Sequence, residues 1–198
     1  MTDSATLRIA RTDDAAAIAD IYRPYVEETA ITFEETPPDT EACLERIEDT
    51  LEMYPWFVAE RQGSVLGYAY AGPLRKRPAY RWTAELSVYL DRTARGDGLG
   101  SLLYEALLET LRRQGFASAY GVVTLPNPGS VGFHEAFGFE RVALLPDVGY
   151  KLGEWHDVAW FERELTERTG EPADPTPFTD CRAQDWVDAV LDSAGRSV

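Results

Sequence analysis

A glycine-rich segment in the middle of the chain has the residues needed to bind an anion. It reads Arg95-Gly96-Asp97-Gly98-Leu99-Gly100-Ser101 and continues into an apolar segment with helical spacing. Glycine lets the backbone approach a ligand closely, and a helix that begins there directs its free N–H groups and the positive end of its dipole at the same point. The segment therefore predicts a phosphate-binding loop.

Two other phosphate-binding glycine loops do not match this segment. A P-loop requires a lysine and then Ser or Thr directly after its last glycine, but the residue after Gly100 is Ser101. A dinucleotide-binding loop requires G-x-G-x-x-G at the first strand, whereas these glycines alternate and lie in mid-chain. The remaining pattern is R-x-x-G-x-G, formed by Arg95, Gly98 and Gly100 after the strand-like residues 85–90.

Two side chains on either side of this loop could transfer protons. Glu85 lies among aromatic and apolar residues, which raise the pKa of a carboxyl group toward the range of a general base. Downstream, Asn127, Ser130 and His134 form the frame N-x-x-S-x-x-x-H-x-x-x-G-F. An imidazole titrates near neutrality, so His134 could take up a proton or donate one. The alternatives are a solvated strand glutamate and a structural histidine on a helix face.

Arg75, Lys76 and Arg77 form a cationic cluster just before the strand that carries Glu85. A guanidinium group binds a carboxylate or a similar anion through paired, charged hydrogen bonds. Arg75, Arg77 and Tyr80 are therefore candidates to bind the anionic end of a substrate. The alternative is a solvated loop that balances nearby acidic residues.

Together these motifs resemble those of the GCN5-related N-acetyltransferases (GNAT), in which an R-x-x-G-x-G loop binds the pyrophosphate of acetyl-CoA. Many members carry a tyrosine where this chain has His134. With Phe33, residues 72–82 and Trp155-His156-Asp157-Val158, the chain closely resembles the phosphinothricin N-acetyltransferase family from about Leu7 to Leu165.

The resemblance implies that Glu85 and His134 are the catalytic pair and that acetyl-CoA is the acyl donor. It places the acetyl-CoA contacts at Val88, Tyr89, Leu90, Arg95, Gly96, Asp97, Gly98, Leu99, Gly100, Ser101, Asn127 and Ser130. The acceptor contacts expected are Phe33 and Asn127 from the resemblance, Arg75, Arg77 and Tyr80 from the cationic cluster, and Val158. His156 and Asp157, on a closing strand, are expected to be mainly structural.

The expected reaction is metal-free acetyl transfer to the α-amine of a small amino-acid-like acceptor, of the phosphinothricin or methionine sulfoximine type. It would pass through a tetrahedral intermediate in a homodimer. The alternatives are a non-catalytic acyl-CoA-binding or regulatory module, and an acetyltransferase for a polyamine or a protein N-terminus. A basic acceptor would favour acidic residues, not Arg75 and Arg77, beside Glu85.

Composition limits the possible partners and location. The chain has 198 residues, of which 44% are hydrophobic, enough for one substantial core. A formal charge of −15 disfavours binding to nucleic acid or to an anionic membrane. Two cysteines and two histidines indicate neither a disulfide framework nor a structural metal site, and no targeting or spanning segment is evident, so we expect a cytoplasmic protein. The acidic excess with two lysines resembles salt-adapted proteins; ordinary solubilising charge is the alternative.

Hydrophobic periodicity predicts an α/β layer fold with a mixed sheet. The family resemblance implies that this is the α/β (α+β) GNAT fold, with a mixed, largely antiparallel sheet flanked by helices. Strands are expected at residues 6–10, 56–60, 65–71, 81–90, 117–125, 139–144 and 151–162. Helices are expected after residues 12–14 and 36–40 and at residues 98–114, 130–137 and 184–191. We expect an N-acetyltransferase domain at residues 1–165 and an acidic, proline-containing extension at 166–198, whose short amphipathic helix docks on its own domain.

Overall fold

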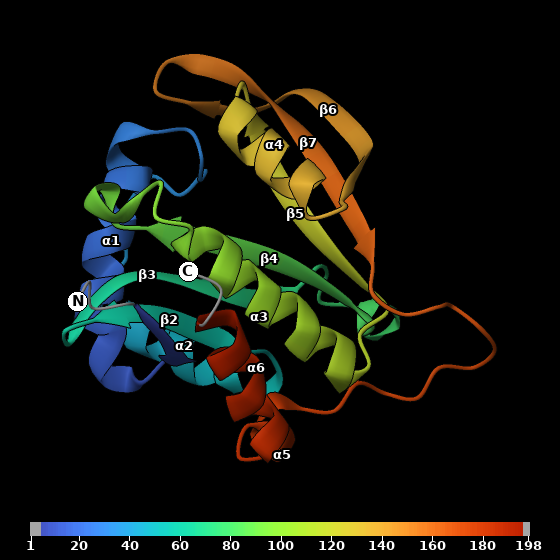
Figure 1. The fold of residues 1–198 in the computed structure, drawn as a ribbon. Coiled ribbons are helices and arrows are strands. Elements are labelled where there is room, and N and C mark those ends of the chain that lie inside the picture. Colours follow the sequence, from blue (N-terminus) through green and yellow to red (C-terminus); the bar gives the residue numbers. More distant parts are fainter. Residues whose placement is uncertain (1–4, 196–198) are drawn as a thin grey trace.

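The computed structural model describes residues 5–195, which form a seven-stranded sheet covered by helices on both faces (Figure 1). This arrangement confirms the predicted mixed α/β fold. The elements are β1 Thr6–Ile9, α1 Ala15–Glu28, α2 Thr40–Met53, β2 Trp56–Arg61, β3 Ser64–Pro73, β4 Thr83–Leu90, α3 Leu99–Gln114, β5 Ser118–Leu125, α4 Pro128–Ala136, β6 Glu140–Lys151, β7 Glu154–Glu164, α5 Phe178–Cys181 and α6 Asp185–Gly195.

The order of strands in the sheet is β1-β2-β3-β4-β5-β7-β6. Within the described chain, β4 and β5 are the parallel neighbours, and they pair only from Thr83 to Glu85, opposite Ser118 to Tyr120. Figure 1 shows the two strands diverging beyond this short pairing. The remainder of β4 therefore keeps backbone groups on its β5 side that no β5 ladder uses, and Glu85 lies where the strands part.

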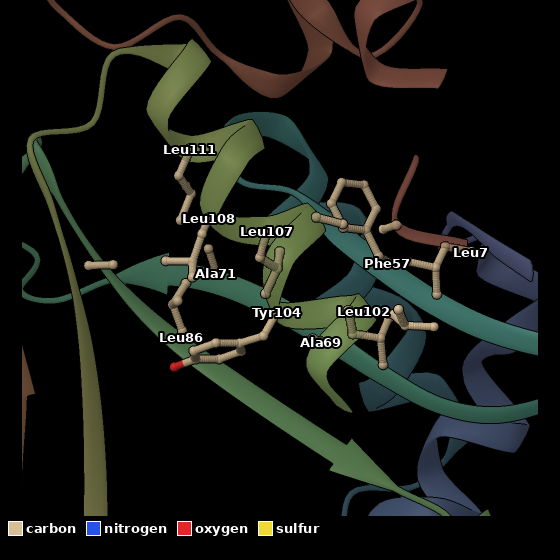
Figure 2. Close-up of a cluster of buried hydrophobic side chains, with 14 of the residues drawn as sticks. Leu7, Phe57, Ala69, Ala71, Leu86, Leu102, Tyr104, Leu107, Leu108 and Leu111 are labelled. Carbon is tan, nitrogen blue, oxygen red and sulfur yellow. The ribbon is translucent and has the colours of Figure 1, made fainter. Parts of the chain in front are cut away.

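One face of the sheet is covered by α3, whose leucines repeat at helical spacing. The residues of this stripe are all at most 4% exposed: Leu99, Leu102, Leu103, Ala106, Leu107 and Leu111. Figure 2 shows α3 side chains packed over Ala69, Ala71 and Leu86 of β3 and β4. The small alanines let the helix approach the sheet, and each buried leucine stabilises the fold by about 2 kcal/mol.

The opposite face is covered by α1 and α2. Alternate strand residues, including Val58, Tyr68 and Tyr89, point to this side and pack with Ile18 and Ile47. Asp39 caps α2 by accepting a hydrogen bond from the N–H of Ala42. The segment 29–39 between the two helices is irregular.

The C-terminal extension packs against the core on the α3 side of the sheet, which confirms that its helix docks on its own domain. Phe178 of α5 is fully buried against Phe57, and Val187 of α6 is fully buried beside α3. Thr176 exchanges hydrogen bonds with Gln114 at the end of α3, both of 2.8 Å. Trp186 is partly buried, and its ring lies 5.3 Å from the Arg113 guanidinium.

Three predicted strand boundaries are wrong. Lys151 was predicted to begin the last strand, but it ends β6, and Leu152 and Gly153 form the turn with φ of 54° and 88°. Asn-Gly and Asp-Gly are the pairs typical of such a left-handed turn, and this turn has neither. The sequence pattern therefore did not indicate a turn here. The preceding strand continues to Lys151, and its predicted end at residue 144 was too early because a bulge between Leu145 and Gly149 interrupts the alternation. At the other boundary, Pro78–Tyr80 forms a 3-10 turn, so β4 begins at residue 83 instead of 81.

Within residues 5–195, no helix combines the length and the apolar composition needed to cross a membrane.

Candidate active site

The glycine loop has the backbone conformation that its sequence suggests. Gly96 and Gly98 have φ of +90° and +77°, a left-handed conformation that side-chain-bearing residues rarely adopt. The N–H groups of Ser101 and Leu102 bond to the Gly98 carbonyl oxygen, so the first N–H groups of α3, from Leu99 and Gly100, have no acceptor within the helix. An added Cβ on Gly96 or Gly98 would meet no atom within 4 Å. The loop therefore presents open backbone and a helix N-terminus, which fit a phosphate group.

Tyr25 of α1 joins this loop to the end of β4. Its hydroxyl donates to the Leu90 carbonyl at 2.7 Å and accepts from the Leu90 N–H at 3.1 Å. Its ring lies 5.1 Å from the Arg95 guanidinium, within cation–π range. Asp97 forms an exposed ion pair with Arg61 at 3.6 Å. A ligand that bonds to the backbone of Leu90 must therefore displace the Tyr25 hydroxyl, whereas no side chain within residues 5–195 bonds to the backbone of Val88.

Glu85 lines a pocket of about 370 Å³ on the α1 and α2 side of the sheet. Burial raises the pKa of its carboxyl group above the usual value, and the nearby Arg75 charge opposes the rise. The Arg75 guanidinium itself stacks over Trp160 at 4.7 Å. The pocket thus contains a carboxyl group of raised pKa, and a cation lies close by, stacked on the lining residue Trp160.

His134 is buried on the other side of the sheet and has partners on both ring nitrogens. Its Nδ1 lies 2.8 Å from the Ser130 carbonyl oxygen, and its Nε2 lies 3.0 Å from the Tyr104 hydroxyl. A carbonyl oxygen only accepts, so in the neutral ring Nδ1 carries the proton and Nε2 accepts from Tyr104. Burial lowers the pKa of the imidazole, which favours this neutral form.

The backbone around His134 is shaped to hold the ring. Its side chain lies against Gly121 of β5, where an added Cβ would collide with the imidazole. On the other side, its ring stacks on Phe161 with centroids 5.5 Å apart. Asn127 caps α4 by accepting from the N–H of Ser130 at 3.1 Å. The N-x-x-S-x-x-x-H frame therefore sets the start of α4 and the orientation of its histidine.

The structure places the other predicted acceptor residues in two groups. Phe33 and Val158 line the same pocket as Glu85, whereas Arg77 and Tyr80 lie on the exposed loop before β4. His156 and Asp157 have structural bonds: the first ring bonds through Nε2 to the Lys151 carbonyl, and the Asp157 carboxylate accepts from the Asp147 N–H.

Several pocket residues were missed because nothing local in the sequence marks them. Thr32, Ser87, Trp160 and Val148 line the pocket, and Tyr104 reaches His134 from another helix. Trp160 and Val148 lie on strands whose alternation identifies their face only when the pairing is known. Within the described residues, no group of three or more His, Cys, Asp or Glu side chains is placed to hold a metal ion.

Comparison with known proteins gives consistent matches over most of the chain. A family model described as an acetyltransferase (GNAT) domain matches residues 7–160. The phosphinothricin N-acetyltransferase of Streptomyces viridochromogenes is 41% identical, over 86% of this chain and 91% of the relative. The L-methionine sulfoximine/L-methionine sulfone acetyltransferase of Salmonella typhimurium is 35% identical, over 85% of this chain and 99% of the relative. A crystal structure of a phosphinothricin acetyltransferase from Sinorhizobium meliloti in complex with acetyl-CoA superposes with a TM-score of 0.82, at 39% identity, covering 86% and 94% of the two chains.

Proposed function

Because the chain belongs to the GNAT acetyltransferase family, we propose that Glu85 is the general base of an acetyl-CoA-dependent N-acetyltransferase that acts on small amino-acid-like amines. The family and the acyl donor follow from the matches to phosphinothricin N-acetyltransferases and to a structure with bound acetyl-CoA. The observation that supports the catalytic assignment is the position of Glu85, in a pocket and at the point where β4 and β5 part.

We propose that acetyl-CoA binds along the open side of β4 with its pyrophosphate on the glycine loop. The free N–H groups at the start of α3 would bind the phosphate oxygens, with the Arg95 guanidinium beside them. Backbone groups of Val88, on the open side of β4, would pair with the pantetheine arm, and the thioester would then lie near Glu85. The backbone groups of Tyr89 face β3 in the β3–β4 ladder, so Tyr89 stays a contact predicted from the resemblance. Asp97, Ser101, Asn127 and Ser130 stay predicted contacts from the resemblance.

The proposed reaction begins with the acceptor's ammonium group losing a proton to Glu85, directly or through a water molecule. The free amine then attacks the thioester carbonyl carbon, and the C–N bond forms as the carbonyl oxygen becomes an oxyanion. When this tetrahedral intermediate collapses, the C–S bond breaks and the thiolate of CoA leaves. The nitrogen loses a second proton, and the thiolate gains one, so the products are the acetamide and CoA.

We propose that His134 relays this second proton. Its Nε2 is unprotonated in the neutral ring and can accept a proton, while Nδ1 stays bonded to the Ser130 carbonyl. The Tyr104 hydroxyl fixes the direction of Nε2. The sequence left open whether His134 acts as a base or as an acid. We propose that it acts as both in turn: it first takes up the proton from the nitrogen and then donates it to the thiolate.

Arg75 is proposed to bind the acceptor's anionic end, together with Arg77 and Tyr80 from the exposed loop. Replacing Arg75 by Gln is expected to raise the KM for an amino acid about tenfold, because a charged hydrogen bond is lost, and to change the KM for its carboxamide little. Steady-state kinetics on matched acid and amide acceptors measures the difference. Arg81→Gln, which breaks an exposed ion pair with Asp174 at 3.2 Å, serves as the control. Equal losses on both acceptors would rule out an anion-binding role for Arg75.

A homodimer through β6 and β7 is also proposed. Of the nine exposed large hydrophobic residues in the described chain, six lie on this edge hairpin: Val142, Leu144, Val148, Tyr150, Leu152 and Trp155. An apolar patch of this kind marks a protein interface more often than a solvated surface.

We also propose that the catalytic domain ends, and the C-terminal extension begins, near residue 165.

Introducing a charge on this patch is expected to dissociate the dimer. Trp155→Asp should elute as a monomer in size-exclusion chromatography with light scattering, because a carboxylate cannot be buried there unpaired. Trp186→Asp, on α6 and outside the patch, should leave the oligomeric state unchanged. A wild-type chain that is monomeric at micromolar concentration would contradict the proposed interface.

A further inference from the structure

The segment 29–37 forms one wall of the pocket that Glu85 lines, in which we propose that the acceptor binds and which we call the acceptor pocket. Its base is held by α1 and α2. Thr32 and Phe33 of this segment line the pocket beside Glu85. The Tyr22 hydroxyl lies 2.7 Å from Thr32 Oγ1, and Arg46 binds the Glu34 carboxylate through two hydrogen bonds of 2.9 and 3.0 Å. These contacts hold the base of the segment, but none of them reaches the far side of the pocket.

A hydrogen bond from Lys151, the last residue of β6, connects this segment to the far side of the pocket. Lys151 is 6% exposed, and its Nζ donates to the Thr32 carbonyl oxygen at 2.7 Å. A buried ammonium group is unfavourable unless its charge and donors are satisfied. Burial lowers the pKa of Lys151, and the carboxylates of Glu34 and Glu35 from the same segment oppose this.

A second contact lies two residues earlier on the same strand. The tip of the Phe33 ring occupies the space above Gly149, where an added Cβ would collide with it. Residues 149 and 151 lie on the same face of β6 because strand side chains alternate. His156 of β7 supports this face: its Nε2 bonds to the Lys151 carbonyl at 3.0 Å, and its ring centroid lies 6.3 Å from that of Phe33.

We propose that Gly149 and Lys151 form a seat on β6 that holds segment 29–37 in its acceptor-binding position. Both are positioning residues: Lys151 fixes the Thr32 backbone, and Gly149 makes room for the Phe33 ring. A wall that is already ordered loses less conformational entropy when the acceptor binds. The seat should therefore affect acceptor affinity and leave acetyl-CoA binding and the chemical step unchanged. This proposal rests on the proposed acetyltransferase function.

Lys151→Met tests this hydrogen bond while keeping an aliphatic chain of similar length. The KM for the acceptor should rise about tenfold, with kcat and the KM for acetyl-CoA within about twofold of wild type. The matched control is Arg163→Met on β7, because Arg163 also donates to a backbone carbonyl, that of Phe137 at 2.8 Å, but away from the pocket. A merely structural role predicts similar kinetics for both variants. An unchanged acceptor KM, or an equal rise in the KM for acetyl-CoA, would overturn the proposal.

Gly149→Ala tests the seat without removing a charge. The added methyl group must displace the Phe33 ring, which is 40% exposed and free to move outward, so the acceptor KM should rise as in Lys151→Met and the fold should persist. This variant carries the test if Lys151→Met does not fold. An acceptor KM equal to that of wild type would contradict the role of Gly149.

Amide hydrogen exchange separates failure of the seat from failure of the proposed function. In both variants, exchange should be faster in residues 29–37 than in wild type, and Arg163→Met should leave this segment unchanged. This result does not depend on which amine is acetylated. If no amine is acetylated, the proposed function fails while exchange still tests the seat; unchanged exchange in both variants would overturn the seat itself.

Discussion

Replacing Glu85 by Gln is expected to lower kcat by about 10²-fold or more at neutral pH, because the acceptor's ammonium group loses its proton acceptor. The loss should shrink as the pH approaches the pKa of that ammonium group, where the free amine forms without help. In the wild type, activity should fall as the pH drops through the raised pKa of Glu85. Initial rates of thiol release between acidic and alkaline pH measure both effects.

Stability distinguishes a lost base from a damaged fold. The folded-state pKa of Glu85 is raised, so its charged form is destabilising above that pKa, and Glu85→Gln should be at least as stable as wild type at pH 7. Glu105→Gln, on the exposed face of α3, is the matched control and should keep full activity. Near-normal turnover of Glu85→Gln across the pH range, at saturating acetyl-CoA, would exclude Glu85 as the base.

Replacing His134 by Gln is the second substitution expected to have a large effect. It should lower kcat by about 10²-fold, because it removes the proposed proton relay, and should weaken the fold by about 1–3 kcal/mol, since the Tyr104 hydroxyl loses a buried acceptor. Tyr104→Phe keeps the imidazole and removes only the bond to Nε2, so its loss of kcat should be smaller. Steady-state kinetics and denaturant unfolding of the two variants separate these contributions.

The pH dependence of stability gives an independent check on His134. Burial lowers its folded-state pKa below the unfolded value, so the unfolded chain binds more protons between the two values. The wild type should therefore lose stability as the pH falls through this window, and His134→Gln should lack that part of the loss. Unfolding curves of equal pH dependence would show that His134 is not held neutral, and a fully active His134→Gln would exclude its relay role.

The parts of this protein that the sequence predicts well are encoded in contiguous residues. The leucine stripe of α3 and the left-handed Gly96 and Gly98 follow from local spacing and from the conformational freedom of glycine. Glu85 could be recognised because the residues around it on its own strand are apolar. The Asn127 cap and the start of α4 follow from a short motif for the same reason.

The parts that were missed depend on which elements meet in space. In the sequence, Tyr104 is indistinguishable from the apolar residues around it in α3. Only the position of α4 shows that the Tyr104 hydroxyl reaches His134. Lys151 bonds to a residue 119 positions away, and no local pattern reports such a contact. Its assignment to the wrong strand followed from a turn at Leu152 and Gly153 that the usual residue pairs do not mark.

The most direct test of the central claim is to identify the products of a reaction with acetyl-CoA. Purified protein would be incubated with acetyl-CoA and with phosphinothricin, methionine sulfoximine, common amino acids or polyamines, and the products would be analysed by mass spectrometry and thiol release. We predict N-acetylation of at least one amino-acid-like acceptor at the α-nitrogen, with one CoA released per acetyl group transferred. Binding of acetyl-CoA with no acetylated product from any amino-acid-like amine would contradict the account.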